Sequence, residues 1–220
     1  IDEDIQHQPE HIAKPLFITE YEAMAWPDFI ENQIGAFGSI PFILGIGNHE
    51  TVPPYKTRED FILQFADWLN APMLREQRLR DDPKDHRIKT YFHWIDRGVA
   101  FYYLDSASAE QFDFAQVSWF ERNLAKDSGN PAVKTIVAGM HKVLPDSISA
   151  GHGMNESPTG IESGRRVYAD LLRARNEAHL GIEVVLDVGV LGVEVPRPVQ
   201  PRRPGVASHL SVRDAGRRRL

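Results

Sequence analysis

The sequence predicts an α/β fold, and three observations support this prediction. Three apolar runs have the length and composition of buried strands: 41–46, 133–138 and 182–186. Segments with apolar residues at helical spacing lie between or beside them: 57–70, 116–124 and 163–178. Buried strands that alternate with helices favour a sheet covered by helices. Two further β-rich runs around a short turn, within 89–104, add antiparallel character, so we expect a mixed sheet.

The first forty residues are expected to be mostly loop and one helix. Apolar residues recur at loosely helical spacing within 21–34, and Pro27 is a candidate for the first helical turn. The run 41–46 that follows is bounded by proline and glycine, which favours a strand. After it, Thr57 and Asp60 have the spacing of a helix start, so a helix is expected from there to about Asn70.

The central part of the chain predicts a loop, a hairpin and a helix. Residues 75–89 are charged and contain Pro83, which favours a surface loop. The hairpin strands are expected at 89–95 and 99–104, on either side of a turn that ends at Gly98. The helix 116–124 then places its apolar side chains on one face.

The last predicted elements are a strand at 133–138, a helix at 163–178 and a strand at 182–186. Gly181 is well placed to end the helix, because glycine adopts the left-handed conformation at helix ends. The sequence shows no internal repeat.

Composition sets limits on the class of protein. The 220 residues are 42% hydrophobic and 25% charged, which is ordinary for one globular domain with appendages. The chain has no cysteine, so disulfides and thiolate metal sites are excluded and any metal must be held by His, Asp, Glu or Asn. No apolar stretch has the length of a membrane span. Nothing in the sequence indicates a compartment.

The net charge of −6 conceals a division at about residue 195. Residues 196–220 hold seven Arg and one acid, Asp214, so this segment carries +6 and the remainder −12. We therefore expect a domain over 1–195 and an Arg/Pro-rich tail over 196–220 that is disordered or non-native. An Arg-, Pro- and Gly-rich end is also typical of a shifted reading frame in a GC-rich gene.

The block Gly47-Asn48-His49-Glu50 is the most informative motif. It follows a predicted buried strand, and glycine lets the chain turn so that Asn and His stand side by side at the strand's carboxyl end. Further along, the hairpin ends in Leu104-Asp105, the predicted helix has the pattern 116–121, and the next strand leads to His141. In order and spacing, residues 41–142 resemble the calcineurin-like metallophosphoesterases, a superfamily that includes the purple acid phosphatases.

The resemblance implies a metallophosphoesterase-type α/β/β/α sandwich and hydrolysis of a phosphate-ester substrate. In this family water is activated at a dinuclear centre of divalent or trivalent ions, for which Fe, Zn or Mn would serve. Asn48 and His141 would be metal ligands, and His49 would be catalytic, contacting the phosphate and protonating the leaving oxygen. Glu50 would orient a neighbouring group, and His152 would line the pocket or lie on an exposed loop.

The sequence also departs from the family pattern. Residues 1–40 contain neither of the family's first two metal-binding blocks, so the chain is expected to begin after them. Residues 187–189 stand where the family's closing His-x-His pair would be. Two neutral ligands cannot complete a dinuclear centre. We therefore expect weak or incomplete metal binding and little phosphatase activity from the chain as it stands.

Two other functions remain open from the sequence. In the first, the chain is a non-catalytic relative that uses the same scaffold for binding. In the second, its basic tail binds nucleic acid or an acidic membrane. The acidic body disfavours nucleic-acid binding by the domain itself. The sequence does not name a substrate, because the loops 51–90 and 143–163 have no distinctive composition.

Overall fold

The structure is a computed structural model. Its sheet and helices form an α/β fold. It describes the following residues: 18–40, 42–51, 57–107, 111–147, 153–186 and 211–214. The chain divides between Phe42 and Ile43 into two units.

Among its described residues, the first unit has one helical segment. Helix α2 spans Ile18–Asp28, continues as a π-helix over Phe29–Ile34 and ends in a 3-10 turn over Gly35–Phe37. The helix is confirmed, but Pro27 lies next to the end of α2 rather than in its first turn. Proline lacks the N–H that continues the α-helical ladder, and the π-helix begins two residues after it, at Phe29.

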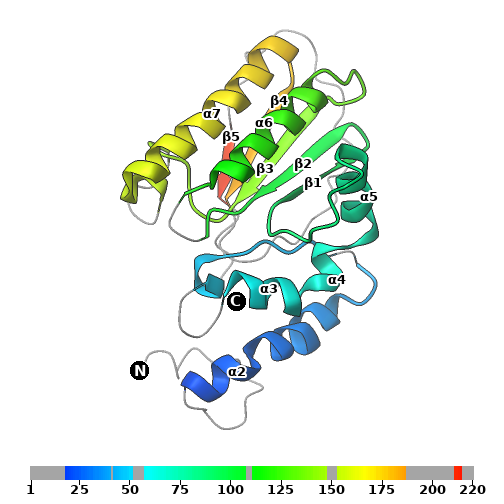
Figure 1. Cartoon of the computed structure of the whole chain (residues 1–220), viewed down its shortest axis with the longest axis vertical. Helices are drawn as coiled ribbons and strands as arrows, with labels where there is room; N and C mark the ends of the chain where they lie inside the picture. Colours follow the sequence, from blue (N-terminus) through cyan, green and yellow to red (C-terminus); the bar gives the residue numbers. More distant parts are fainter. Residues whose placement is uncertain are drawn as a thin grey trace. The chain divides into compact units, whose positions relative to one another are not determined.

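The second unit is built on a mixed sheet in the strand order β1-β2-β3-β4-β5 (Figure 1). The first pair is antiparallel and the later pairs are parallel. The strands span Phe92–Asp96, Val99–Leu104, Thr135–Met140, Gly181–Leu186 and Ser211–Asp214. The predicted mixed sheet and α/β class are therefore confirmed.

The hairpin forms where it was predicted. Arg97 and Gly98 occupy the turn between β1 and β2 with φ of 45° and 81°. Two consecutive positive φ values match the twist of the flanking strands, and glycine adopts such a value without steric cost. A Cβ at Gly98 would also lie 3.0 Å from the Ala132 carbonyl oxygen. Both the positive φ and the lack of space for a side chain therefore favour glycine here.

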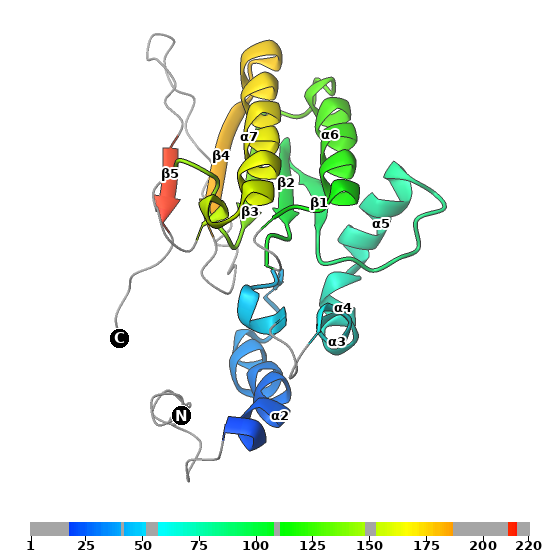
Figure 2. The same ribbon diagram turned by 60° about the vertical axis from the view of Figure 1, so that its left-hand side comes forward.

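Two long helices, α6 (Phe114–Ser128) and α7 (Pro158–Ala178), lie side by side on one face of the sheet (Figures 1 and 2). Both were predicted, and both begin earlier than expected. Asp113 and Ser157 cap them by accepting hydrogen bonds from the backbone N–H three residues on. The main hydrophobic core fills the space between these helices and the sheet, with Phe120, Ile136 and Leu171 at 1% exposure or less.

The end of α7 differs from the prediction. His179 adopts the left-handed conformation, with φ of 55°, and Gly181 instead begins β4. A Cβ at Gly181 would lie 3.2 Å from the Thr135 hydroxyl oxygen, so close packing against β3 accounts for this glycine.

The predicted helix over 57–70 forms in two pieces, α3 (Arg58–Gln64) and α4 (Ala66–Leu69). Thr57 and Asp60 make the expected capping box: Thr57 Oγ1 accepts from Asp60 N at 3.1 Å, and Thr57 N donates to Asp60 Oδ2 at 3.0 Å. Phe65 interrupts the helix with φ of −108° while its ring is buried.

The predicted loop over 75–89 is wrong for its first half. Helix α5 spans Pro72–Asp81, with proline in the first turn, and Leu74 and Gln77 are buried. The segment is rich in residues of high helix propensity, and burial of Leu74 supplies the packing that a charged helix needs. Residues 85–89 are irregular, as expected.

The predicted strand over 41–46 does not pair with another strand within the described residues. Residues 42–47 are extended and buried, but no neighbouring strand among those described supplies a ladder of backbone hydrogen bonds. The apolar pattern predicted burial correctly, whereas strand pairing depends on a partner.

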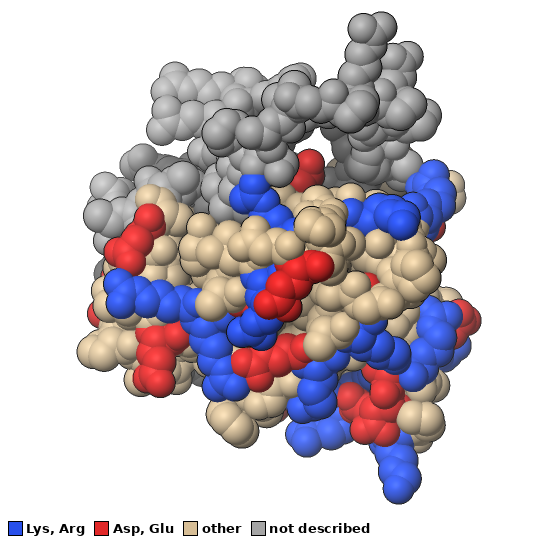
Figure 3. All heavy atoms as spheres, turned by 90° about the horizontal axis from the view of Figure 1, so that it is seen from above, with Lys and Arg blue, Asp and Glu red and all other residues tan. Residues whose placement is uncertain are grey.

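The tail prediction concerns residues that mostly lie outside the described ranges. Within 196–220 only 211–214 are described, and they form β5 beside β4. Of the described helices, none has both the length and the apolar character that crossing a bilayer requires. On the face seen in Figure 3, basic and acidic side chains are interspersed rather than gathered by sign.

Candidate functional site

The carboxyl ends of β2 and β3 form the edge at which the predicted site residues gather. The two strands are parallel, and Leu104 at the end of β2 pairs with Met140 at the end of β3. Asp105 and His141 therefore leave the sheet at the same edge. Strand β4 ends level with them at Leu186, and Asp187, which follows it, lies outside the described residues.

Asn48 and His141 meet at this edge although they are 93 positions apart in the sequence. His141 Nε2 lies 2.7 Å from Asn48 Oδ1, which is a hydrogen bond in which the ring nitrogen donates. Asn48 begins the 3-10 turn Asn48–Thr51, and both side chains are partly exposed. The two residues that were predicted to be metal ligands are therefore in direct contact.

Close packing fixes the backbone that carries Asn48. Tyr103 is buried, and its hydroxyl donates to the Ile46 carbonyl oxygen at 3.1 Å. A Cβ at Gly45 would lie 2.1 Å from the Tyr103 ring, so only glycine lets the segment lie against it. A Cβ at Gly47 would meet the Glu50 carboxylate at 2.7 Å and the His141 ring at 3.4 Å.

The Glu50 side chain makes a hydrogen bond within its own motif. Its Oε2 accepts a hydrogen bond from Gly47 N at 3.0 Å, and Thr51 Oγ1 donates to the Asn48 carbonyl oxygen at 3.1 Å. These bonds hold the turn that presents Asn48. The side chain of His49, and the whole of His152, lie outside the described part of the structure. Their predicted roles stay predictions.

Asp105, at the same edge, accepts hydrogen bonds from several neighbouring segments. Arg58 donates to it from Nε at 2.7 Å and from Nη2 at 3.0 Å, and the Thr90 hydroxyl also donates to it. Its Oδ1 accepts from Ala107 N at 3.0 Å, so Asp105 also caps the turn that follows β2. Hydrogen bonding to Asp105 raises the pKa of Arg58, so the guanidinium stays charged.

A second polar group follows β3 directly. Lys142 is buried, its backbone N–H donates to Ser106 Oγ at 2.8 Å, and its ammonium lies 3.7 Å from Glu156 Oε2. Glu156 belongs to the 3-10 turn Met154–Glu156. Charged groups at this edge are thus already paired with one another.

The Asn48–His141 pair fits one part of a metal site. Adjacent donor atoms of one ion stand roughly 3 Å apart when each lies about 2.1 Å from the metal, so a separation of 2.7 Å needs little opening. The chemistry is also suitable, since an amide oxygen and an imidazole nitrogen bind Fe, Zn and Mn. In the described ranges, however, no three His, Cys, Asp or Glu side chains converge on one point.

Sequence reasoning missed a buried group that we call the His93 cluster, consisting of Asp81, His93, Tyr102 and Asp127. His93 Nε2 bonds to Asp81 Oδ2, and its Nδ1 lies 3.4 Å from Asp127 Oδ2 without good hydrogen-bond alignment. The Tyr102 hydroxyl donates to the same Asp127 oxygen at 2.5 Å. The available signal was strand alternation, which places His93 and Tyr102 on one face of the hairpin.

In the His93 cluster, burial and ion pairing shift the pKa values of His93 and Asp81 in opposite directions. Burial lowers the pKa of His93, but the carboxylates of Asp127 and Asp81 outweigh it, so the pKa is raised above its usual value. Burial likewise raises the pKa of Asp81, but His93 and Lys126 more than offset this and the pKa is lowered. Both shifts favour an imidazolium between two carboxylates.

Comparisons with protein-family models, with curated proteins and with solved structures found no match to this chain.

Proposed function

We propose that this chain carries part of a metal-dependent phosphoester hydrolase domain of the calcineurin-like type. The observation that carries the proposal is the 2.7 Å contact between Asn48 Oδ1 and His141 Nε2, two atoms of metal-binding type from distant parts of the sequence. They meet at the carboxyl edge of a parallel strand pair, where α/β proteins place their ligands.

The proposed domain is an α/β/β/α sandwich, and the second face of the sheet supports this. That face carries aromatic rings: Phe92 stacks on Tyr103 with centroids 5.6 Å apart, and Trp94 stacks on Phe101 at 4.7 Å. These rings stand outside the main core that α6 and α7 cover. Two sheets that pack face to face need such apolar inner faces.

Asn48, His141 and Glu50 have distinct roles in the proposed site. Asn48 Oδ1 and His141 Nε2 would hold a metal ion, with the His141 proton moved from Nε2 to Nδ1 so that the ring stays neutral and the Nε2 lone pair faces the metal. Glu50 holds the turn through Gly47 N and so orients Asn48. The metal centre would supply an activated water and positive charge toward the phosphate. The loops would determine which phosphate ester is bound.

A non-catalytic binding function on the same scaffold is the second candidate. The observation that favours it is that, across the described ranges, no group of three His, Cys, Asp or Glu side chains is arranged to hold a metal ion. Two neutral ligands do not neutralise a dinuclear centre. The chain as it stands is therefore expected to bind metal weakly.

Metal titration of the full chain tests the proposal. Mn²⁺ and Zn²⁺ are titrated calorimetrically into the wild type, Asn48→Ala, His141→Ala and the control His86→Ala, whose imidazole is exposed elsewhere. We expect weak binding that both site variants abolish and the control retains. Binding unchanged in the site variants would overturn the metal assignment. Two tightly bound ions with turnover of an aryl phosphate would instead refute the expected incompleteness.

A further inference from the structure

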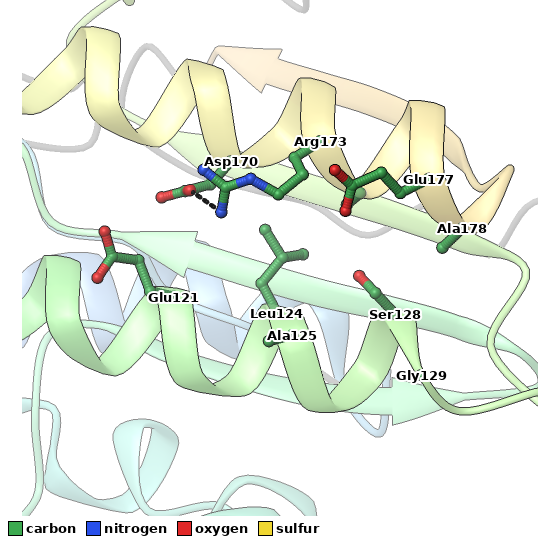
Figure 4. Close-up of a pocket in the computed structure, with 10 residues that line it drawn as sticks. Glu121, Leu124, Ala125, Ser128, Gly129, Asp170, Arg173, Glu177 and Ala178 are labelled. Carbon is green, nitrogen blue, oxygen red and sulfur yellow. Dashed lines mark ion pairs between the residues drawn. The ribbon is translucent and has the colours of Figure 1, made fainter.

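A groove of about 280 Å³ lies between helices α6 and α7, away from the residues discussed above (Figure 4). Its size is close to the lower end of the range for ligand pockets, about 300 Å³. Both helices contribute polar and apolar side chains to it. The residues that matter most are Glu121, Leu124 and Ser128 of α6, and Asp170, Ala174 and Glu177 of α7.

The groove has polar ends and an apolar middle. Each helix connects two parallel strands, so α6 and α7 run in the same direction and Glu121 faces Asp170 while Ser128 faces Glu177 (Figure 4). Seven residues separate the two polar positions on each helix, which corresponds to about 10 Å along the helix axis. Leu124 projects into the space between them.

Two buried polar atoms in the lining lack a hydrogen-bond partner among the described residues. They are Ser128 Oγ at one end of the groove and Asp170 Oδ2 at the other. Asp170 is only 5% exposed, and its other oxygen, Oδ1, pairs with Arg173 Nη1 at 2.9 Å. Buried polar atoms without partners are uncommon, and a bound donor would satisfy these two.

The charge of the groove favours a cation. Three carboxylates line it, from Glu121, Asp170 and Glu177, while two guanidinium groups pair with them: Arg173 with Asp170 at 2.9 Å and Arg166 with Glu121 at 2.8 Å. The Glu177 carboxylate leaves a net negative charge among these five groups. Burial and the nearby Glu121 carboxylate raise the pKa of Asp170 more than Arg173 and Arg166 lower it, so a further cation beside Asp170 would favour its charged form. The Arg173 side chain is 61% exposed, so a ligand cation is able to displace it into solvent.

We propose that this groove binds a linear aliphatic diamine, with one ammonium group at each end. One ammonium donates to Asp170 Oδ2 beside Glu121, and the other donates to Ser128 Oγ and the Glu177 carboxylate. The carbon chain between them covers Leu124 and Ala174. An anion would face three carboxylates, and a wholly apolar ligand would leave both buried polar atoms without partners.

Calorimetric titration of the full chain at low salt tests the ligand chemistry. The probe is heptane-1,7-diamine, whose length matches the spacing of about 10 Å between the polar ends. Propane-1,3-diamine, heptylamine and heptane-1,7-diol are the controls for length, second charge and charge. We expect saturable binding of the probe with one site, at least tenfold tighter than each control. Equal binding of the diol or of the short diamine, or no saturable binding, would overturn the proposal.

Variants test the location. Glu177→Gln is expected to weaken binding of the probe at least fivefold, and Arg173→Gln to tighten it by removing the competing guanidinium. Glu162→Gln is the matched control, because Glu162 is an exposed residue of α7 outside the groove. Equal effects of Glu177→Gln and Glu162→Gln would show that the diamine responds only to the charge of the helix, and the site assignment would fail.

Discussion

The His93 cluster makes a quantitative prediction about stability. His93→Gln keeps a hydrogen-bonding side chain of similar reach but removes the positive charge between Asp81 and Asp127. The side chains of these three residues are 2%, 8% and 3% exposed, so water cannot replace the lost imidazolium. The variant therefore leaves two carboxylates buried without their shared counter-charge.

The expected loss is about 3 kcal/mol. Breaking a buried ion pair by removing one partner costs roughly 3–5 kcal/mol. The lower end applies here because Lys126 still pairs with Asp81 at 3.0 Å, and Tyr102 still donates to Asp127. In a chain of this length each kcal/mol lowers Tm by roughly 2–4 °C, so a decrease of about 6–12 °C is expected.

The contribution of His93 also depends on pH in a definite direction. Its pKa is raised in the folded protein, so the stabilisation is fully present below the unfolded value of about 6.5. It is lost as the pH rises from there through the raised folded pKa. Asp81 has a lowered pKa and contributes oppositely, because its stabilisation is lost as the pH falls below about 3.8 through the folded pKa.

Urea unfolding at a series of pH values measures both effects. The wild type should lose stability as the pH rises above about 6.5, while His93→Gln should be less stable at pH 6 and lack that slope. His86→Gln, the same change at an exposed residue, should match the wild type. A loss below 1 kcal/mol in His93→Gln, or an unchanged pH slope, would refute a charged His93.

Two further substitutions probe the segments that position the candidate site. Asp105→Asn removes the ion pair with Arg58 and weakens the bond from Thr90; because the Arg58 side chain is 36% exposed, solvent screening limits the loss in urea unfolding to about 2 kcal/mol. An unchanged unfolding midpoint would mean that the ion pair does not hold these segments together. Gly45→Ala places a methyl group 2.1 Å from the ring of Tyr103, which is 2% exposed, so a loss of about 3 kcal/mol is expected by the same measurement. A loss within 0.5 kcal/mol would show that the segment is able to shift away from the ring.

Local patterns predicted most of the second unit because each pattern has a direct physical cause. Alternation around Gly98 gave the hairpin, and apolar spacing gave both α6 and α7. The errors occurred where local signals were weak or ambiguous. Pro83 and many charges concealed α5, whose stability depends on burying Leu74. Gly181 offered a better terminator than His179, yet packing beside Thr135 determined its place.

The candidate site was predictable only in part. The sequence placed Asn48 and His141 at the ends of apolar segments, but their 2.7 Å contact depends on how those segments pack. The extended run 42–47 illustrates the difference: its composition predicts burial, whereas its position is fixed by Tyr103 through Ile46 and Gly45. The His93 cluster was not predictable, because its members come from four separate elements, α5, β1, β2 and α6.

The sequence by itself determined the mixed α/β class, the strands β1 to β4, the helices α6 and α7, and the identity of the residues at the carboxyl edge of the sheet. These depend on periodicity, turn chemistry and capping, which act over a few residues. Only the tertiary structure decided which polar groups meet. The Asn48–His141 contact, the Arg58–Asp105 ion pair, the His93 cluster and the groove between α6 and α7 all join residues distant in sequence. Their partners are selected by packing against a shared sheet, and a linear pattern does not encode that selection locally.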